Sequence, residues 1–238
     1  MLYLSPDRLI ALSPPRLMLF NSFEYLIFLP IVFLLYWFVF DYALSKCKHQ
    51  LWLQNLFIVV ASYIFYGWWD WRFLILIAIT SFCSWGSGLL IGRREGEETK
   101  EENTPYTLHL TQKPKFWLIS NIILNLSILG VYKYYDFFAR EFAALLGIES
   151  DFLLLHLILP VGISFYTFQA LSYSIDVYRG HIQPTKDIVA FTAFLSFFPQ
   201  LVAGPIERAT NLLPQFQRKR TFDYAQAVDG MRQILWGL

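Results

Sequence analysis

Polar side chains that could carry chemistry gather in two places within an otherwise apolar sequence. The first set lies on a presumed helix and comprises Ser164, Tyr166, Thr167, Gln169, Ser172, Asp176 and Arg179. The second set follows Pro199 and comprises Gln200, Glu207 and Arg208. Polar and ionisable groups are costly at membrane depth unless they face protein or water, and broken helices there often border substrate paths. We therefore expect both sets to line a path through a membrane protein.

Plainer interpretations of the two sets stay open. Hydroxyls and amides in membrane bundles commonly hydrogen-bond between helices, and Ser164, Thr167 and Ser174 share one face at helical spacing. Asp176 and Arg179 stand three residues apart, so they could form a local ion pair at the membrane boundary. The second set could mark an ordinary helix–loop boundary.

Residue types and spacing reveal no further reactive centre. The sequence contains no phosphate-binding loop, dinucleotide fingerprint or Ser/His/Asp set. Metal-ligand spacing is absent from its histidines and cysteines, which are His49, His109, His156, His181, Cys47 and Cys83. The formal net charge of +1 does not suggest a nucleic-acid surface. We expect no metal, no bound cofactor and no nucleic-acid partner.

The elements that position the polar sets are long apolar runs. The chain is 56% hydrophobic and only 16% charged, which differs from an ordinary soluble domain. Runs close to the length of a membrane-crossing helix predict spans over Tyr25–Phe40, Leu51–Trp69, Phe73–Ile91, Phe116–Tyr132, Phe152–Ile175 and Ile188–Ala203. Pro160 and Gly162 predict a break in the fifth run. The expected fold class is all-α: a polytopic transmembrane helical bundle in a lipid bilayer, with broken or re-entrant helices.

The segments between the runs complete the expected organisation. Residues Met1–Leu17 are expected to be a disordered leader or a mis-assigned start, and Gly92–Lys115 a charged, hydrophilic loop. Aromatic residues around Gly67–Arg72 predict a belt at a tight turn between two spans. Apolar residues at helical spacing predict a short interfacial helix over Asp136–Leu146.

Positive charges predict an orientation that contains one conflict. Lys46, Lys48 and the hydrophilic loop belong in the cytoplasm by the positive-inside rule. Six straight spans would then put the strongly basic stretch Arg218–Arg220 outside. A re-entrant Ile188–Ala203 segment, which returns to the side it came from, would remove the conflict.

Several motifs, in their order along the chain, resemble one family. They are Met18–Pro30 (MLFNSFEYLIFLP), Ala61–Arg72 (ASYIFYGWWDWR), Pro160–Gln169 (PVGISFYTFQ), Ser174–Gly180 (SIDVYRG) and Ala203–Arg208 (AGPIER). Together they resemble the membrane-bound O-acyltransferase family in its alginate O-acetyltransferase branch. The similarity runs from Met18 to Leu238, so residues 18–238 are expected to be the amino-terminal part of a single domain.

The resemblance implies an enzyme that moves an acyl group across a membrane to a hydroxyl. It implies a cytoplasmic acyl thioester donor, either acetyl-CoA or an acyl carrier, and an exported polysaccharide such as alginate as acceptor. It also implies a bacterial inner-membrane location, a periplasmic acetyltransferase partner and exopolysaccharide machinery. In the family, an intramembrane histidine takes the proton of the attacking hydroxyl.

The chain departs from the family pattern near its end. The family histidine lies well past the AGPIER motif, and none of the four histidines here occupies that place, so we assign no catalytic residue. Met231–Leu238 resembles the opening of another helix without a C-cap. We therefore expect a fragment, from a truncated gene, a frameshift or partial expression, that is inactive alone. D-alanyl transfer to teichoic acid and a non-enzymatic transport or assembly scaffold remain alternatives.

Overall fold

Helices form the ordered framework of the described chain, and no strand occurs among the residues described. The computed structural model describes residues 22–40, 43, 47–92, 114–147, 154–201, 204 and 207–237. Helical stretches in it that are long and apolar enough to cross a membrane are Phe23–Phe40, Gln50–Trp68, Trp71–Gly92 and Pro114–Leu146. The predicted all-α membrane bundle is confirmed. The predicted leader over residues 1–17 and positions 93–113 of the predicted hydrophilic loop lie outside the described residues.

The first predicted span is a helix that changes its winding. Helix α2 (Phe23–Leu34) begins at Ser22, whose side chain accepts a hydrogen bond from the backbone N–H of Tyr25 at 3.2 Å. This is ordinary N-capping, which satisfies one backbone donor of the first turn. The chain then continues as the π-helix η1 (Leu35–Phe40).

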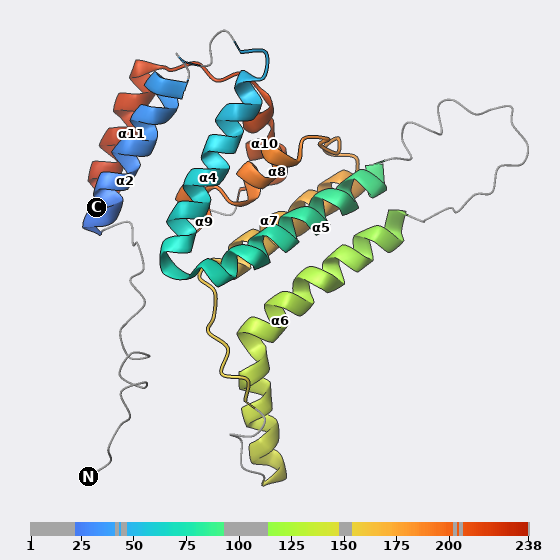
Figure 1. Ribbon diagram of the computed structural model, residues 1–238. Helices are drawn as coiled ribbons and strands as arrows, with labels where there is room; N and C mark the ends of the chain where they lie inside the picture. The colour runs from blue at the N-terminus through green and yellow to red at the C-terminus, as the bar shows by residue number, and fades with distance from the viewer. Residues whose placement is uncertain are drawn as a thin grey trace, which may run out of the picture.

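The second and third predicted spans agree with the structure to within a few residues. They are α4 (Gln50–Asp70) and α5 (Leu74–Gly92), joined by the 3₁₀ turn η2 (Trp71–Phe73). The Asp70 carboxylate caps this turn by accepting a hydrogen bond from the backbone N–H of Arg72 at 2.9 Å. The predicted turn is therefore present, although Gly67 belongs to the last turns of α4. Because η2 reverses the chain, the start of α4 and the end of α5 lie toward the same end of the molecule (Figure 1).

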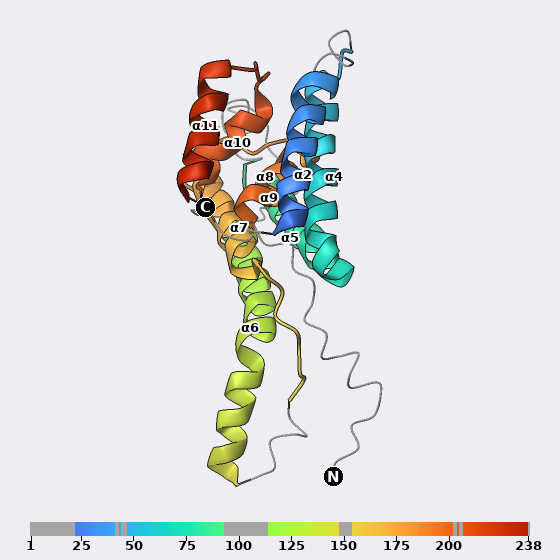
Figure 2. The same cartoon turned by 90° about the vertical axis from the view of Figure 1, so that its left-hand side faces the viewer.

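The prediction of a separate interfacial helix is wrong. Helix α6 runs from Pro114 to Leu146 without a break in helical structure, so the predicted span Phe116–Tyr132 and the predicted helix Asp136–Leu146 form one element. No proline occurs after Pro114 in this stretch, and Gly130 alone does not stop a helix that has no competing turn signal. Its 33 residues correspond to about 50 Å, longer than the bilayer core of about 30 Å. The second half of α6 extends away from the other helices in both views (Figures 1 and 2).

The fifth predicted span is only half helical. Residues 154–160 have no regular secondary structure, and helix α7 (Ile163–Tyr178) begins after a turn at Val161 and Gly162. The predicted break at Pro160 and Gly162 is confirmed. The predicted helix before the break is wrong for residues 154–160, which are not helical. Pro160 has no N–H to donate and disfavours helix at the residue before it, which explains why the helix cannot extend backward.

The sixth predicted span is a broken helix that turns back. It consists of α8 (Ile188–Leu195) and the short α9 (Phe198–Leu201), and α10 (Ala209–Gln217) follows. These helices occupy the space between α4 on one side and α5 and α7 on the other (Figure 1). Near the start of α8, Pro184 packs against Gly92 at the end of α5 so closely that a β-carbon on Gly92 would overlap its ring.

Contacts with α4 show how far the segment from α8 to α10 reaches along the bundle. Phe198 in α9 donates its backbone N–H to the Ser62 hydroxyl at 3.2 Å, well along α4. Phe216, near the end of α10, accepts a hydrogen bond from Asn55 at 2.8 Å, close to the start of α4. The chain thus enters near Gly92 and leaves near Asn55, toward the same end. This is the course that the re-entrant hypothesis predicts; the side of the membrane stays a prediction.

The core is centred on α7 and α8. Its largest fully buried side chains include Tyr166 and Tyr173 from α7 and Phe191 and Phe194 from α8. The rings of Tyr173 and Phe191 lie 4.6 Å apart between centroids. Helix α11 (Tyr224–Gly237), in contrast, buries no residue and is placed beside α2 (Figure 1).

Candidate functional site

The two segments that carry the predicted polar sets meet where α7 begins and α9 ends. Gly162 precedes α7 with a φ of +76°, and a β-carbon there would overlap the carbonyl oxygen of Leu201. The hydroxyl of Tyr66, on α4, donates a hydrogen bond to the carbonyl of Val161. A left-handed glycine and a tyrosine hydroxyl thus hold α4, α7 and α9 at one junction.

Half of the predicted site residues face the interior of the bundle. Those that are buried are Tyr166, Thr167, Gln169, Asp176 and Gln200. Ser164, Ser172 and Glu207 are half-buried. Arg179 and Arg208 are exposed, and their place on a path through the protein stays a prediction. Both arginines stand at helix ends, Arg179 after α7 and Arg208 before α10, so their guanidinium groups can remain solvated.

Three of the buried groups retain hydrogen-bonding capacity that the described residues do not use. They are the hydroxyl of Tyr166, Nε2 of Gln169 and Oδ2 of Asp176. The Tyr166 side chain has no exposed surface, and that of Gln169 is 2% exposed. A buried polar atom without a partner costs about 1–3 kcal/mol, so each one calls for an explanation. All three lie on α7, the helix that the sequence singled out.

A local hydrogen bond accounts for another member of the first set, Ser172. The Ser172 hydroxyl donates to the backbone carbonyl of Gln169 at 3.0 Å. A serine that donates to a carbonyl on the preceding turn of its own helix is satisfied without any partner elsewhere. Ser172 therefore contributes less to the candidate site than its position in the sequence suggested.

The possible ion pair between Asp176 and Arg179 does not form. Oδ1 of Asp176 lies 3.5 Å from Nδ1 of His181 instead, and Arg179 points to the exterior. The chain turns after α7 at Gly180, with φ +72°, and the backbone N–H of His181 donates to the Asp176 carbonyl at 2.9 Å. This turn carries His181 back to the aspartate, a contact that helical spacing alone could not predict.

A buried polar cluster between α5, α6 and α7 was not predicted. Asn121 donates to the Ser174 hydroxyl at 2.7 Å and accepts from the Ser84 hydroxyl at 3.1 Å. Asn125 donates to the Asn121 side-chain oxygen at 3.0 Å. For Ser174, the cluster confirms the plainer interpretation that polar side chains of the bundle hydrogen-bond between helices. Serines three apart on α5 (Ser81, Ser84 and Ser87) and asparagines four apart on α6 were the signal that could have revealed it.

The histidines that the structure describes lie away from the core. His49, His156 and His181 are all exposed, and His109 falls outside the described residues. Among the described residues, no group of three or more His, Cys, Asp or Glu side chains could hold a metal ion. Whether a histidine elsewhere acts as the base stays a prediction.

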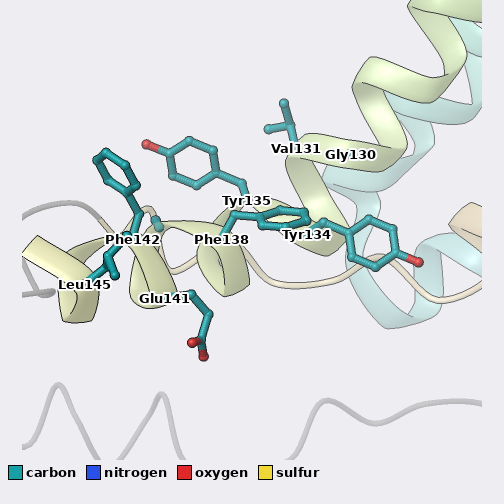
Figure 3. Close-up of a pocket in the computed structure, with 9 residues that line it drawn as sticks. Gly130, Val131, Tyr134, Tyr135, Phe138, Glu141, Phe142 and Leu145 are labelled. Carbon is teal, nitrogen blue, oxygen red and sulfur yellow. The ribbon is translucent and has the colours of Figure 1, made fainter.

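The hollow along the second half of α6 is an exposed helix face. It measures about 800 Å³, and every lining residue comes from the stretch between Gly130 and Leu145. The rings of Tyr134, Tyr135, Phe138 and Phe142 project outward from the helix around it (Figure 3). Since one helix alone forms its walls, this surface cannot enclose reacting groups and is not part of the site.

Curated relatives align with nearly the whole of this chain. A probable alginate O-acetylase AlgI of Azotobacter vinelandii is 35% identical over 224 residues, 92% of this chain and 40% of the relative. Its counterpart in Pseudomonas putida is 38% identical over 224 residues, 92% of this chain and 41% of the relative. A peptidoglycan O-acetyltransferase of Helicobacter pylori is 32% identical over 227 residues, 85% of this chain and 39% of the relative.

The resemblance to the alginate O-acetylase branch of the membrane-bound O-acyltransferases is confirmed. The chain spans about two fifths of the length of the curated relatives it matches. No family model and no solved structure matches it. The alginate O-acetylase similarity and the apolar helices together identify a membrane protein.

Proposed function

We propose that this chain forms the amino-terminal part of a membrane O-acetyltransferase that acetylates hydroxyls of an exported polysaccharide. The similarity to the alginate O-acetylases over 92% of the chain carries the proposal. The unused polar atoms of Tyr166 and Gln169, buried on α7, support a role for that helix in lining the path of the reacting groups. In this proposal Gln200, on the adjoining helix α9, lines the same path as Tyr166 and Gln169.

The proposed reaction is ordinary acyl transfer. The acceptor hydroxyl oxygen bonds to the acetyl carbonyl carbon, the carbon–sulfur bond of the thioester breaks, and the hydroxyl proton passes through a base to the departing thiolate. The donor is acetyl-CoA or an acyl carrier on the cytoplasmic side. The base is the intramembrane histidine of the family, which this chain does not supply at the matching place. The chain is therefore inactive alone, and it works in the bacterial inner membrane with a periplasmic acetyltransferase and the exopolysaccharide machinery.

Exchange of the matched region tests the proposal. Residues 18–238 would replace the corresponding part of the Pseudomonas putida alginate O-acetylase, and the acetyl content of secreted alginate would be measured. We expect acetylation to persist in the chimera, and to fall about tenfold or more when Tyr166→Phe or Gln169→Leu removes a polar atom from the path. Phe168→Leu, at an exposed position on the same helix, is the matched control and should leave acetylation unchanged.

Two outcomes would contradict the proposal. A chimera that reaches the membrane in normal amount and leaves alginate unacetylated would reject the assigned activity. Turnover of a thioester donor by the purified 238-residue chain would reject the claim that it lacks the base.

Peptidoglycan is the second candidate acceptor, because the Helicobacter pylori relative is named for it. A matched exchange into that enzyme separates the two acceptors. Acetylated peptidoglycan from the second chimera, with unacetylated alginate from the first, would favour peptidoglycan.

A further inference from the structure

A cavity of about 290 Å³ lies among α2, η1, α4, α9 and α10. Its walls are mostly apolar and include Leu29, Val32, Phe33, Trp37, Ile58 and Phe198. The volume is at the small end of the range for ligand pockets, enough for part of a ligand rather than a whole one. None of the residues predicted for acyl transfer lines it.

One arginine gives this cavity a charge. The guanidinium carbon of Arg220 lies 5.3 Å from the ring centroid of Tyr36 and 5.4 Å from that of Phe216. Arg220 also donates a hydrogen bond to the side-chain oxygen of Asn55. Asn55 is fixed in turn by its own hydrogen bond to the Phe216 carbonyl. Two rings and an amide therefore hold the guanidinium group in place at the cavity wall.

The positive charge of Arg220 has no counter-charge in the described part of the chain. Its Nε is buried without a hydrogen-bond partner, and no described carboxylate forms an ion pair with it. Burial lowers the pKa of Arg220, because removal of the guanidinium group from water disfavours its charged form. A buried charge is normally paired, so the free Nε–H is a donor that an anionic oxygen would satisfy.

The cavity borders the apolar exterior of a membrane helix. Phe33 lines the cavity and is also exposed on α2, which together with η1 has the length and composition of a membrane span. Ile31 and Leu34 on α2 and Phe38 on η1 are also exposed. Arg218 and Lys219, both exposed, precede Arg220 and add positive charge at this end of the molecule. An apolar wall that opens toward lipid, with a cation at one end, matches a phospholipid better than a water-soluble anion.

We propose that this cavity binds an anionic phospholipid, with a phosphate oxygen accepting a hydrogen bond from Nε of Arg220 and an acyl chain lying along α2. The first part of the acyl chain enters the cavity between Val32 and Phe198, and the rest of the acyl chain follows the exposed face of α2. This role is independent of acetyl transfer, because it uses none of the residues assigned to that path.

Binding to the full 238-residue chain in detergent tests the proposal. Phosphatidylglycerol, phosphatidylcholine and inorganic phosphate would be added separately, with bound lipid counted by native mass spectrometry and the melting temperature measured. We expect phosphatidylglycerol to bind and raise the melting temperature, with little effect from the other two. Arg220→Gln should weaken phosphatidylglycerol binding about tenfold or more, since a charged hydrogen bond is lost. Arg140→Gln removes the same charge at an exposed position on α6, outside the cavity lining, and should bind like the unaltered chain.

A second variant separates lipid binding from a purely structural role of Arg220. Val32→Phe fills the cavity and leaves Arg220 and Asn55 unchanged, so it should also weaken phosphatidylglycerol binding. Equal binding by Arg220→Gln and the unaltered chain would overturn the proposal, as would equal binding of phosphatidylcholine. Protection by inorganic phosphate alone would show a simple anion site and reject the lipid.

Discussion

Gly162 lies against the carbonyl oxygen of Leu201, at a distance that leaves no room for a β-carbon. This contact joins the start of α7 to the end of α9, which are about forty residues apart in the chain. It brings the helix that carries Tyr166 and Gln169 against the broken helix that carries Gln200. The glycine also adopts a φ of +76°, which a larger residue reaches only with strain.

Substitution of this glycine should loosen the junction. We expect Gly162→Ala to lower the free energy of unfolding by at least about 1–2 kcal/mol, because a left-handed alanine is strained and its β-carbon overlaps Leu201. Thermal unfolding in detergent measures the effect. Gly130→Ala is the matched control, since nothing lies within 4 Å of a β-carbon there and alanine favours helix by about 0.5–1 kcal/mol. Equal stability of the two variants would contradict the packing described.

The buried asparagine between three helices should contribute measurably to stability. Asn121→Leu keeps the approximate size of the side chain and removes its hydrogen bonds with Ser84 and Ser174. We expect the free energy of unfolding to fall by about 1–2 kcal/mol, since hydrogen bonds between membrane helices are modest. Asn211→Leu, at an exposed position on α10, should change it by less than about 0.5 kcal/mol. An unchanged free energy of unfolding in Asn121→Leu would show that the cluster contributes no net stability.

Acid should weaken the turn between α4 and α5. Burial of Asp70 opposes its ionisation, but the hydrogen bonds and charge of Arg72 outweigh this and hold the pKa of Asp70 below its ordinary value of 3.8. The unfolded chain therefore binds a proton at higher pH than the folded chain does. The stabilising contribution is present above pH 3.8 and is lost as the pH falls through the lower folded value. Melting temperatures between pH 3 and 5 should fall more for the unaltered chain than for Asp70→Asn, and parallel curves would contradict this.

The re-entrant course of α8 to α10 predicts which positions share a side of the membrane. In a chain whose Cys47 and Cys83 are replaced by serine, single cysteines would be placed by Arg179→Cys, Arg218→Cys and Arg72→Cys. We expect a membrane-impermeant thiol reagent to label the first two from the same side and the third from the other. Lys48→Cys, near the start of α4, is the control for the side shared by the first two. Labelling of positions 179 and 218 from opposite sides would reject the re-entrant course.

The sequence by itself determined the fold class and the polar positions worth attention. Long apolar runs predict helices because hydrocarbon leaves the backbone no other partner for its hydrogen bonds, and α4 and α5 match their predicted runs to within a few residues. Pro160 and Gly162 likewise predict the break before α7. These are local effects, which depend on residues near one another in the chain.

Only the tertiary structure decided which polar groups meet. Composition could not show that α6 continues through Tyr134 to Leu146, because an amphipathic interfacial helix and the end of a long one have the same periodicity. Nor could spacing pair Asp176 with His181, Asn121 with Ser174, or Arg220 with Asn55. The turn after α7 decides the first of these contacts, whereas the other two join segments that are separate in the chain and depend on how several helices pack at once. The sequence states which residues are polar, and the packing selects which of them lie within hydrogen-bonding distance.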